Sequence, residues 1–225
     1  MGLIRDDSIF YLVLNDGDNT FDNEKISKVD KYLDEVEKSE GPAVLVTVGT
    51  GSKKFSTGFD LHFWAEDFQN LMTSIPRMQL LLARFMTLSV PTLAIINGHA
   101  YAGGLILALC HDFRIMHDGK RKICLSELNL GMALPTAYNV ITKATVDIQT
   151  FRKIHYAHTY SAREALEDRI VQDLYKDEAD ANKRIQAFAD KFSSVSIHRA
   201  GIRNNKEFMF RDDLQKIRTQ TFSES

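Results

Sequence analysis

The hydrophobic pattern in the first part of the chain alternates between strand-like and helix-like segments. Residues 8–15, SIFYLVLN, are rich in β-branched and aromatic side chains and end at a turn cluster, which predicts a strand. Residues 23–40 carry apolar side chains at spacings of three and four among charges, which predicts an amphipathic helix. Residues 43–49, AVLVTVG, predict a strand buried on both faces. This strand–helix–strand order implies parallel pairing with a right-handed crossover.

The pattern then continues in the same alternating way and becomes mostly helical toward the C-terminus. A loop rich in Gly and Ser precedes a long helical pattern from about residue 62 to residue 88. The further elements that we expect are strands at 91–98, 113–118 and 122–127, a helix starting at the pair Gly103-Gly104, and helices at 136–157, 161–168 and 178–194. We therefore expect one α/β domain over residues 1–225 with a helical C-terminal third.

Composition narrows the class of protein. The 225 residues are 44% hydrophobic and carry a net charge of −2, so the balance favours neither nucleic acid nor an anionic membrane surface as partner. No apolar run is long enough for a membrane span, and the segments MGLIRDDSIF and FSES resemble neither a secretory signal nor a peroxisomal address. Cys110 and Cys124 lie inside apolar runs and are expected to be buried free thiols. We expect an intracellular protein.

Two glycine-bearing loops follow buried strands and precede helices. They are FSTGFDL, residues 55–61, and NGHAYAGG, residues 97–104. The glycine pair on its own is equally consistent with close packing of a helix on a strand. The carboxyl ends of neighbouring parallel strands are where α/β sheets usually bind ligands, and one backbone N–H from each loop could hold an oxygen that gains negative charge. That arrangement is an oxyanion hole.

The loop FSTGFDL, followed by VPTLAIINGHAYAGGLILALCHDFRIM, resembles the crotonase superfamily of enoyl-CoA hydratases and isomerases. The resemblance runs from about Ile9 to about Asp173. It implies a spiral of ββα units over about residues 1–160, with a helical region over about 161–225 that serves oligomer packing. It also implies that the N–H groups of Phe59 and Gly103 form the oxyanion hole for the carbonyl of an acyl-CoA thioester.

The same resemblance distinguishes two reactions by their carboxylates. The family's hydratases use two glutamates, and the first of these positions is Ile106 here, which cannot activate water. The second falls in CLSELNLGM, where Glu127 is present. A single base suits the 1,3-proton shift of a Δ3,Δ2-enoyl-CoA isomerase, and burial among Leu125, Leu128 and Leu130 is expected to raise the pKa of Glu127. A hydratase, or a non-catalytic acyl-CoA-binding or structural subunit, remains an alternative.

Further expectations concern the substrate site and the surroundings of the protein. The predicted substrate-binding residues are Ser56, Thr57, Gly58, Asp60, Leu61, Trp64, Phe68, Ala102, Gly104, Ile106 and Leu130. Lys53 and Lys54 are equally consistent with contacts to CoA phosphates and with solvated loop positions. The resemblance implies no metal, no cofactor apart from the coenzyme A of the substrate, a homotrimer or dimer of trimers, and a location in the peroxisome or mitochondrion, with the cytoplasm as an alternative.

Three histidines and a serine near these segments raise the possibilities of a metal site and of a serine hydrolase, but their spacing fits neither. His99, His111 and His117 lack the spacing of a metal site, so structural roles are expected for them. Ser126 is not part of a G-x-S-x-G nucleophile elbow. A Ser–His–Asp hydrolase is therefore disfavoured.

Overall fold

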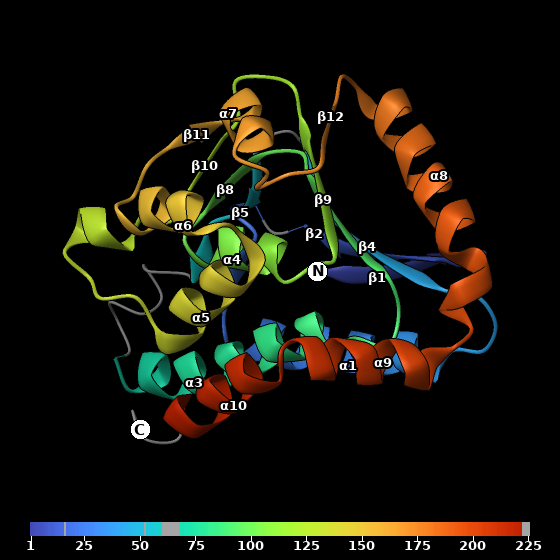
Figure 1. Cartoon of the computed structure of the whole chain (residues 1–225), viewed down its shortest axis with the longest axis horizontal. Helices are drawn as coiled ribbons and strands as arrows, with labels where there is room; N and C mark the ends of the chain where they lie inside the picture. Colours follow the sequence, from blue (N-terminus) through green and yellow to red (C-terminus); the bar gives the residue numbers. More distant parts are fainter. Residues whose placement is uncertain (16, 52, 60–67, 222–225) are drawn as a thin grey trace.

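The strands of the computed structural model, which describes residues 1–15, 17–51, 53–59 and 68–221, form two sheets and one small pair (Figure 1). The larger sheet has six strands in the order β1 (Gly2–Asp6), β2 (Ile9–Leu14), β4 (Val44–Gly49), β7 (Thr92–Ile96), β9 (Phe113–His117) and β12 (Asp173–Tyr175). The smaller sheet has the order β11 (Tyr160–Ser161), β10 (Lys122–Cys124), β8 (His99–Tyr101) and β5 (Lys54–Ser56). The short strands β3 (Thr20–Phe21) and β6 (Gly58–Phe59) pair with each other.

Helices follow these strands in a repeated order. They are α1 (Asn23–Lys38), α3 (Phe68–Met86), α4 (Gly103–Leu109), the 3-10 helix η1 (Glu127–Leu130), α5 (Thr136–Thr145), α6 (Ile148–His155), α7 (Ala162–Glu167), α8 (Glu178–Ser196), α9 (Arg199–Met209) and α10 (Arg211–Thr221). Three successive segments each give one strand to the larger sheet, one to the smaller sheet, and then a helix: β4–β5–α3, β7–β8–α4 and β9–β10–α5. The parallel pairing that was expected for residues 8–15 and 43–49 is confirmed, since β2 and β4 run parallel.

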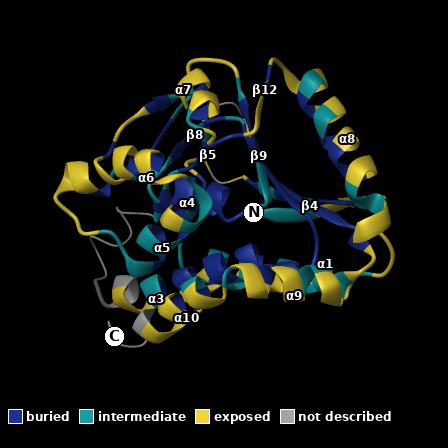
Figure 2. Cartoon of the chain, in the orientation of Figure 1, coloured by how far each residue is buried: buried dark blue, intermediate teal, exposed yellow. Residues whose placement is uncertain are grey.

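The central strands of the six-stranded sheet, β4 and β7, are buried on both faces, as their continuous apolar sequences predict, whereas the edge strand β1 is largely exposed. In β4, Val44 and Val46 face the cluster under α8, whereas Leu45 between them faces the main core. Helix α8 stands apart from the other helices, and its exposed outer face is yellow in Figure 2. The main core lies between the sheets and the helices α1, α3, α4 and α5.

One expected helix is two helices, and seven of the described strands lie outside the segments that were expected to be strands: β1, β3, β5, β6, β8, β11 and β12. The pattern over 136–157 breaks at Val146, whose backbone is extended, because Asp147 caps a new helix by accepting hydrogen bonds from the N–H groups of Gln149 and Thr150. Strands β1 and β12 close the two edges of the larger sheet, and their short segments carry little periodicity of their own. The long helix expected from about residue 62 is described from Phe68 onward.

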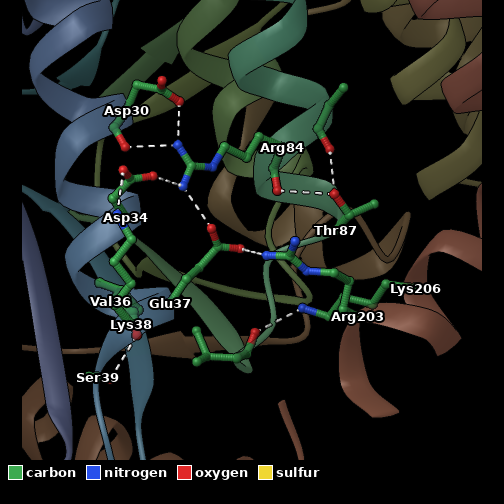
Figure 3. A network of polar contacts seen from close by, with 12 residues as sticks. Asp30, Asp34, Val36, Glu37, Lys38, Ser39, Arg84, Thr87, Arg203 and Lys206 are labelled. Carbon is green, nitrogen blue, oxygen red and sulfur yellow. Dashed lines mark hydrogen bonds and ion pairs between the residues drawn. The ribbon is translucent and has the colours of Figure 1, made fainter. Parts of the chain in front are cut away.

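A network of charged side chains ties α9 to α1 and α3 (Figure 3). The guanidinium of Arg84 contacts three carboxylates of α1: Asp30 at 2.5 Å, Asp34 at 2.6 Å and Glu37 at 2.7 Å. Burial would lower the pKa of Arg84, but these hydrogen bonds outweigh it and raise that pKa above its ordinary value. Glu37 also pairs with Arg203 of α9. Helix α10 then packs against α3 and α5, so the C-terminal helices brace the helices around the main core.

Two cysteines and a histidine that the sequence analysis discussed have structural roles in the core. Cys110 and Cys124 are buried free thiols, as predicted. The imidazole of His111 contacts Thr47 Oγ1 at 2.7 Å and the carbonyl of Leu107 at 2.8 Å, and burial lowers its pKa to about 3. His111 is therefore a neutral core residue.

None of the helices in the described ranges is long and apolar enough to cross a membrane.

Candidate active site

A cavity of about 970 Å³ opens where the two glycine loops meet η1 and α5. The predicted site residues that line this cavity are Thr57, Phe59, Ala102, Gly103, Glu127 and Leu130. These residues come from three separate segments of the chain: the first glycine loop, the second glycine loop and η1. The fold thus brings the proposed base and both proposed amide donors to one cavity, which is the arrangement that the two loops predict.

The first loop is held by hydrogen bonds around Ser56. The hydroxyl of Ser56 donates to the carbonyl of Asn19 at 2.7 Å and accepts from the N–H of Gly58 at 3.2 Å. Gly58 has a φ of +81°, a conformation that favours glycine. A Cβ atom on Gly58 would lie 2.6 Å from the backbone nitrogen of Gly103, so the two loops are in direct contact.

The second loop explains the adjacent glycines. Ala102 has a φ of +51°, an uncommon value for alanine, and its N–H donates to the carbonyl of Cys124 at 2.9 Å. Gly103 is the first residue of α4, so its N–H has no acceptor within the helix. A Cβ atom on Gly104 would lie 2.1 Å from the carbonyl oxygen of Ser56. Gly104 therefore lets α4 begin directly against β5, while Gly103 borders the cavity.

Four other predicted substrate contacts lie behind the lining of the cavity. Ser56, Gly58, Gly104 and Ile106 are buried and are not among the described residues that line it. For these four, direct contact with substrate stays a prediction. Asp60, Leu61 and Trp64 lie outside the described residues, as does the side chain of Phe68.

Glu127 begins the helix η1 and is only 7% exposed. Its Oε2 atom is buried and has no hydrogen-bond partner. Burial raises the pKa of this carboxyl to about 7, against an opposing hydrogen bond from its own backbone N–H. The predicted direction of the shift is confirmed, but the predicted surroundings are wrong in part: Leu125 is buried, whereas Leu128 and Leu130 are 48% and 59% exposed. The short turn of η1 leaves these two side chains largely exposed, and Leu130 lines the cavity.

Two tyrosines that the sequence analysis did not single out also line the cavity. Tyr138 of α5 is buried, and its hydroxyl lies next to Gly103. The N–H of Lys122 donates to His99 Nδ1, so this nitrogen is an acceptor without a proton of its own. The hydroxyl of Tyr101 of β8 is therefore the donor in its hydrogen bond to the same nitrogen, at 3.1 Å. In the sequence, Tyr138 has only the signature of a buried helix position. Its proximity to Gly103 arises from the packing of α5 on α4.

Charged residues beside the cavity come from β5 and from the turn between β2 and β3. Asp18 lines the cavity, is more than half exposed, and forms an ion pair with Lys54. Lys54 therefore has a partner within the chain, whereas Lys53 is exposed. Among the described lining residues, Asp18 and Glu127 are the carboxylates, and Glu127 is the buried one.

Comparison with known proteins agrees with this geometry. Residues 5–222 match the family model for enoyl-CoA hydratase/isomerase. Over 157 residues the chain is 29% identical to the peroxisomal enoyl-CoA delta isomerase 2 of Arabidopsis thaliana, a match that covers 66% of this chain and 65% of that protein. Over 181 residues it is 29% identical to a probable enoyl-CoA hydratase of Bacillus subtilis, covering 79% of this chain and 69% of that protein. The chain thus matches just under two thirds of the Arabidopsis relative's length.

Solved structures show the same fold. The crystal structure of an enoyl-CoA hydratase/isomerase family protein from Pseudomonas syringae superposes with a TM-score of 0.90 at 20% identity, covering 99% of this chain and 95% of that one. The expected crotonase-like α/β architecture is confirmed by this likeness. Because the family model matches nearly the whole chain, the chain belongs to the enoyl-CoA hydratase/isomerase family.

Proposed function

We propose that this protein isomerises 3-enoyl-CoA thioesters to trans-2-enoyl-CoA thioesters, with Glu127 as the single base. The observation that carries the proposal is the position of Glu127: a buried carboxylate on the same cavity as Phe59 and Gly103. The naming of an Arabidopsis relative as an enoyl-CoA delta isomerase supports it.

The reaction is a proton shift along the acyl chain. The carboxylate of Glu127 takes a proton from C2, and the electron pair of that C–H bond moves into a dienolate whose charge rests largely on the thioester oxygen. The backbone N–H groups of Phe59 and Gly103 donate hydrogen bonds to this oxygen. Glu127 then returns the proton at C4, and the double bond moves into conjugation with the carbonyl. The atoms balance without water or a redox partner, so the proposed reaction needs no cofactor beyond the coenzyme A of the substrate.

The environment of Glu127 suits both halves of this shift. A pKa of about 7 leaves a substantial fraction of the carboxyl ionised near neutral pH, and it also makes the protonated form a competent acid. A carboxylate of ordinary pKa would hold the C2 proton too weakly to return it efficiently at C4. The same group can therefore remove and deliver the proton.

A hydratase is the second candidate, because one relative carries that name. Hydration requires a positioned water and a second acid–base group. Ile106, where the family's hydratases place one glutamate, is fully buried and apolar. The other described lining carboxylate, Asp18, is paired with Lys54 at the exposed end of the cavity. These observations favour the isomerase.

The metabolic setting that we propose follows from the chemistry. A 3-enoyl thioester arises when a chain with a pre-existing double bond is shortened two carbons at a time, so we place the protein in the β-oxidation of unsaturated fatty acids. Peroxisome or mitochondrion is the proposed compartment, and a homotrimer or a dimer of trimers is the proposed assembly.

The test supplies trans-3-hexenoyl-CoA and trans-2-hexenoyl-CoA in separate reactions to the whole chain. Chromatography follows the conjugated 2-enoyl thioester and the 3-hydroxyacyl thioester. We expect conversion of the 3-enoyl thioester without accumulation of hydroxyacyl product, and loss of that conversion in Glu127→Gln. Hydroxyacyl product as the main outcome would establish the hydratase instead, and binding of both thioesters without turnover would establish a non-catalytic role.

A further inference from the structure

We propose that the hydroxyl of Tyr138 donates a third hydrogen bond to the thioester oxygen, beside the N–H groups of Phe59 and Gly103. This inference rests on the proposed function and adds to it a catalytic side chain that substitution can remove. The two amides belong to the backbone, so Tyr138 is the donor through which the proposed oxyanion hole can be tested directly.

The position of the phenol is the first argument. A Cβ atom on Gly103 would lie 2.3 Å from the hydroxyl oxygen of Tyr138 and 3.3 Å from its Cζ atom. The hydroxyl therefore lies against the α-carbon of the residue whose N–H is the proposed donor. Both residues line the same cavity, as does Glu127. An oxygen that accepts from the Gly103 N–H thus lies within reach of this hydroxyl.

The packing of α5 fixes this position. The side chain of Tyr138 is 2% exposed, and the helix begins immediately after Pro135. The N–H of the preceding residue, Ala137, donates to Gln79 Oε1 of α3 at 2.8 Å, and the carbonyl of Tyr138 accepts from the Thr142 hydroxyl at 2.7 Å. The backbone of α5 is therefore fixed around Tyr138, and burial of the ring leaves rotation about the C–O bond as the main freedom of the hydroxyl. A donor held in this way needs little reorganisation when charge develops.

The protonation state of Tyr138 is the second argument. Burial, and after it the nearby charge of Glu127, hold the pKa of the phenol well above its usual value of 10. The hydroxyl therefore keeps its proton at physiological pH and remains a donor. During the proposed reaction it transfers no proton: the hydrogen bond strengthens as the dienolate forms and weakens as the proton returns at C4.

The third argument concerns the choice between the oxyanion and Glu127 as acceptor. Glu127 Oε2 is buried without a hydrogen-bond partner, so Tyr138 does not bond to that atom. The effect of Glu127 on Tyr138 is Coulombic, and the hydrogen bond that acts on the Glu127 pKa comes from its own backbone N–H. A donor to the carboxylate would also weaken it as a base, whereas a donor to the oxyanion stabilises the dienolate.

The experiment compares wild type, Tyr138→Phe and the control Tyr175→Phe with trans-3-hexenoyl-CoA over a range of pH. Tyr175 is also a buried tyrosine, but it lies in β12 and outside the residues that line the cavity. For Tyr138→Phe we expect kcat and kcat/KM to fall together on the order of 100-fold with KM nearly unchanged, because the hydrogen bond forms mainly in the transition state. The midpoint of the pH profile should stay where Glu127 sets it. Tyr175→Phe should match wild type.

Two results would overturn the inference. Wild-type kcat in Tyr138→Phe would show that the hydroxyl only fills space, and a fall in kcat with a displaced pH midpoint would show that it acts on Glu127. Unfolding in urea monitors the fold of each variant, so a loss of activity that merely tracks a loss of folded protein also counts against the inference.

A binding measurement separates this inference from the proposed function. Acetoacetyl-CoA, a β-keto thioester, can present enolate charge at the thioester oxygen without turning over as a 3-enoyl substrate. We expect tighter binding of acetoacetyl-CoA than of butyryl-CoA to wild type, and loss of that preference in Tyr138→Phe. If wild type fails to isomerise but shows this Tyr138-dependent preference, the isomerase proposal fails and the third donor stands. If wild type isomerises and Tyr138→Phe behaves identically in both assays, the third donor fails alone.

Discussion

The hydroxyl oxygen of Tyr138 occupies the space that a Cβ atom on Gly103 would need, at a separation of 2.3 Å. The α-carbon of Gly58 closes the same space from the opposite loop, 3.2 Å from that Cβ position. Residue 103 is thus enclosed by α5 on one side and by the first glycine loop on the other. The glycine here is required by side-chain packing as well as by access to its backbone N–H.

Gly103→Ala should therefore be destabilised, and removal of the phenol oxygen should relieve it. We expect the single variant to lose about 1–3 kcal/mol of unfolding free energy through overpacking. Gly103→Ala combined with Tyr138→Phe should recover much of that loss, since the next atom of the ring, Cζ, is 3.3 Å away. Urea unfolding of the four proteins in the cycle measures the coupling. Additive losses would show that the two groups do not compete for one space.

Gly104→Ala should be more damaging, and Tyr138→Phe should not rescue it. The added Cβ would meet the carbonyl oxygen of Ser56 at 2.1 Å, and this oxygen belongs to the backbone of β5. No flexible side chain can yield there, so α4 and β5 must move apart. We expect a loss larger than that of Gly103→Ala, seen as a lower urea midpoint or as insoluble protein. A Gly104→Ala protein as stable as wild type would contradict the close approach of α4 and β5.

The raised pKa of Glu127 predicts opposite pH effects on activity and on stability. Because the carboxylate is the proposed base, kcat/KM should rise with pH around a midpoint of about 7. The folded state holds the proton more tightly than the unfolded chain, whose pKa is near 4.5, so the contribution of Glu127 to stability falls as pH rises from about 4.5 to about 7. Glu127→Gln should lower kcat by about 10²- to 10⁴-fold.

The stability arm of this prediction compares Glu127→Gln with wild type at two pH values. Relative to wild type, the variant should gain on the order of 2 kcal/mol between pH 4.5 and pH 8, because only wild type must ionise a buried carboxyl over that interval. Urea unfolding at both pH values provides the measurement. A stability difference that does not change with pH would mean that Glu127 titrates as an exposed carboxyl does.

The sequence predicted the parts of the fold that depend on local periodicity. The spacing of apolar side chains over residues 23–40 predicted α1, and the continuous apolar run at 43–49 predicted β4. Strand β12 has three residues, which is too few for an alternating pattern. It forms because its backbone pairs with β9 in parallel. The break between α5 and α6 did have a local signal: Asp147 is a capping residue inside an otherwise continuous helical pattern.

The candidate site divides in the same way. The two glycine loops were visible in the sequence because close approach and positive φ restrict the residue type at single positions, as Gly58 and Gly104 illustrate. Tyr138 was not visible, because its contact with Gly103 depends on how α5 packs on α4. The exposure of Leu128 and Leu130 likewise follows from the 3-10 turn, which the sequence pattern did not specify.

A buried ion pair outside the cavity fixes the C-terminal helices to the larger sheet. Lys206 of α9 is 9% exposed, and its ammonium donates to Asp112 Oδ2 at 2.6 Å and to the carbonyl of Val90 at 2.9 Å. The same Oδ2 accepts from the N–H and the hydroxyl of Thr92 at the start of β7. Burial lowers the pKa of Lys206, and the charge of Asp112 opposes that shift. The lysine thus depends on its carboxylate partner.

Lys206→Met should therefore be destabilising, and its loss should not add to that of a substitution at Asp112. The single variant removes the ammonium and leaves the Asp112 carboxylate with the Thr92 donors and the charge of Arg114, and we expect it to lose about 3 kcal/mol of unfolding free energy. Lys206→Met combined with Asp112→Asn removes both charges, so it should lose less than the two single variants together. Urea unfolding of wild type, the two single variants and the double variant tests this.

Because the pair lies outside the cavity lining, kcat with trans-3-hexenoyl-CoA should stay within about twofold of wild type in folded Lys206→Met. Additive losses would indicate that the lysine stabilises α9 through its contact with Val90 and its packing rather than through Asp112.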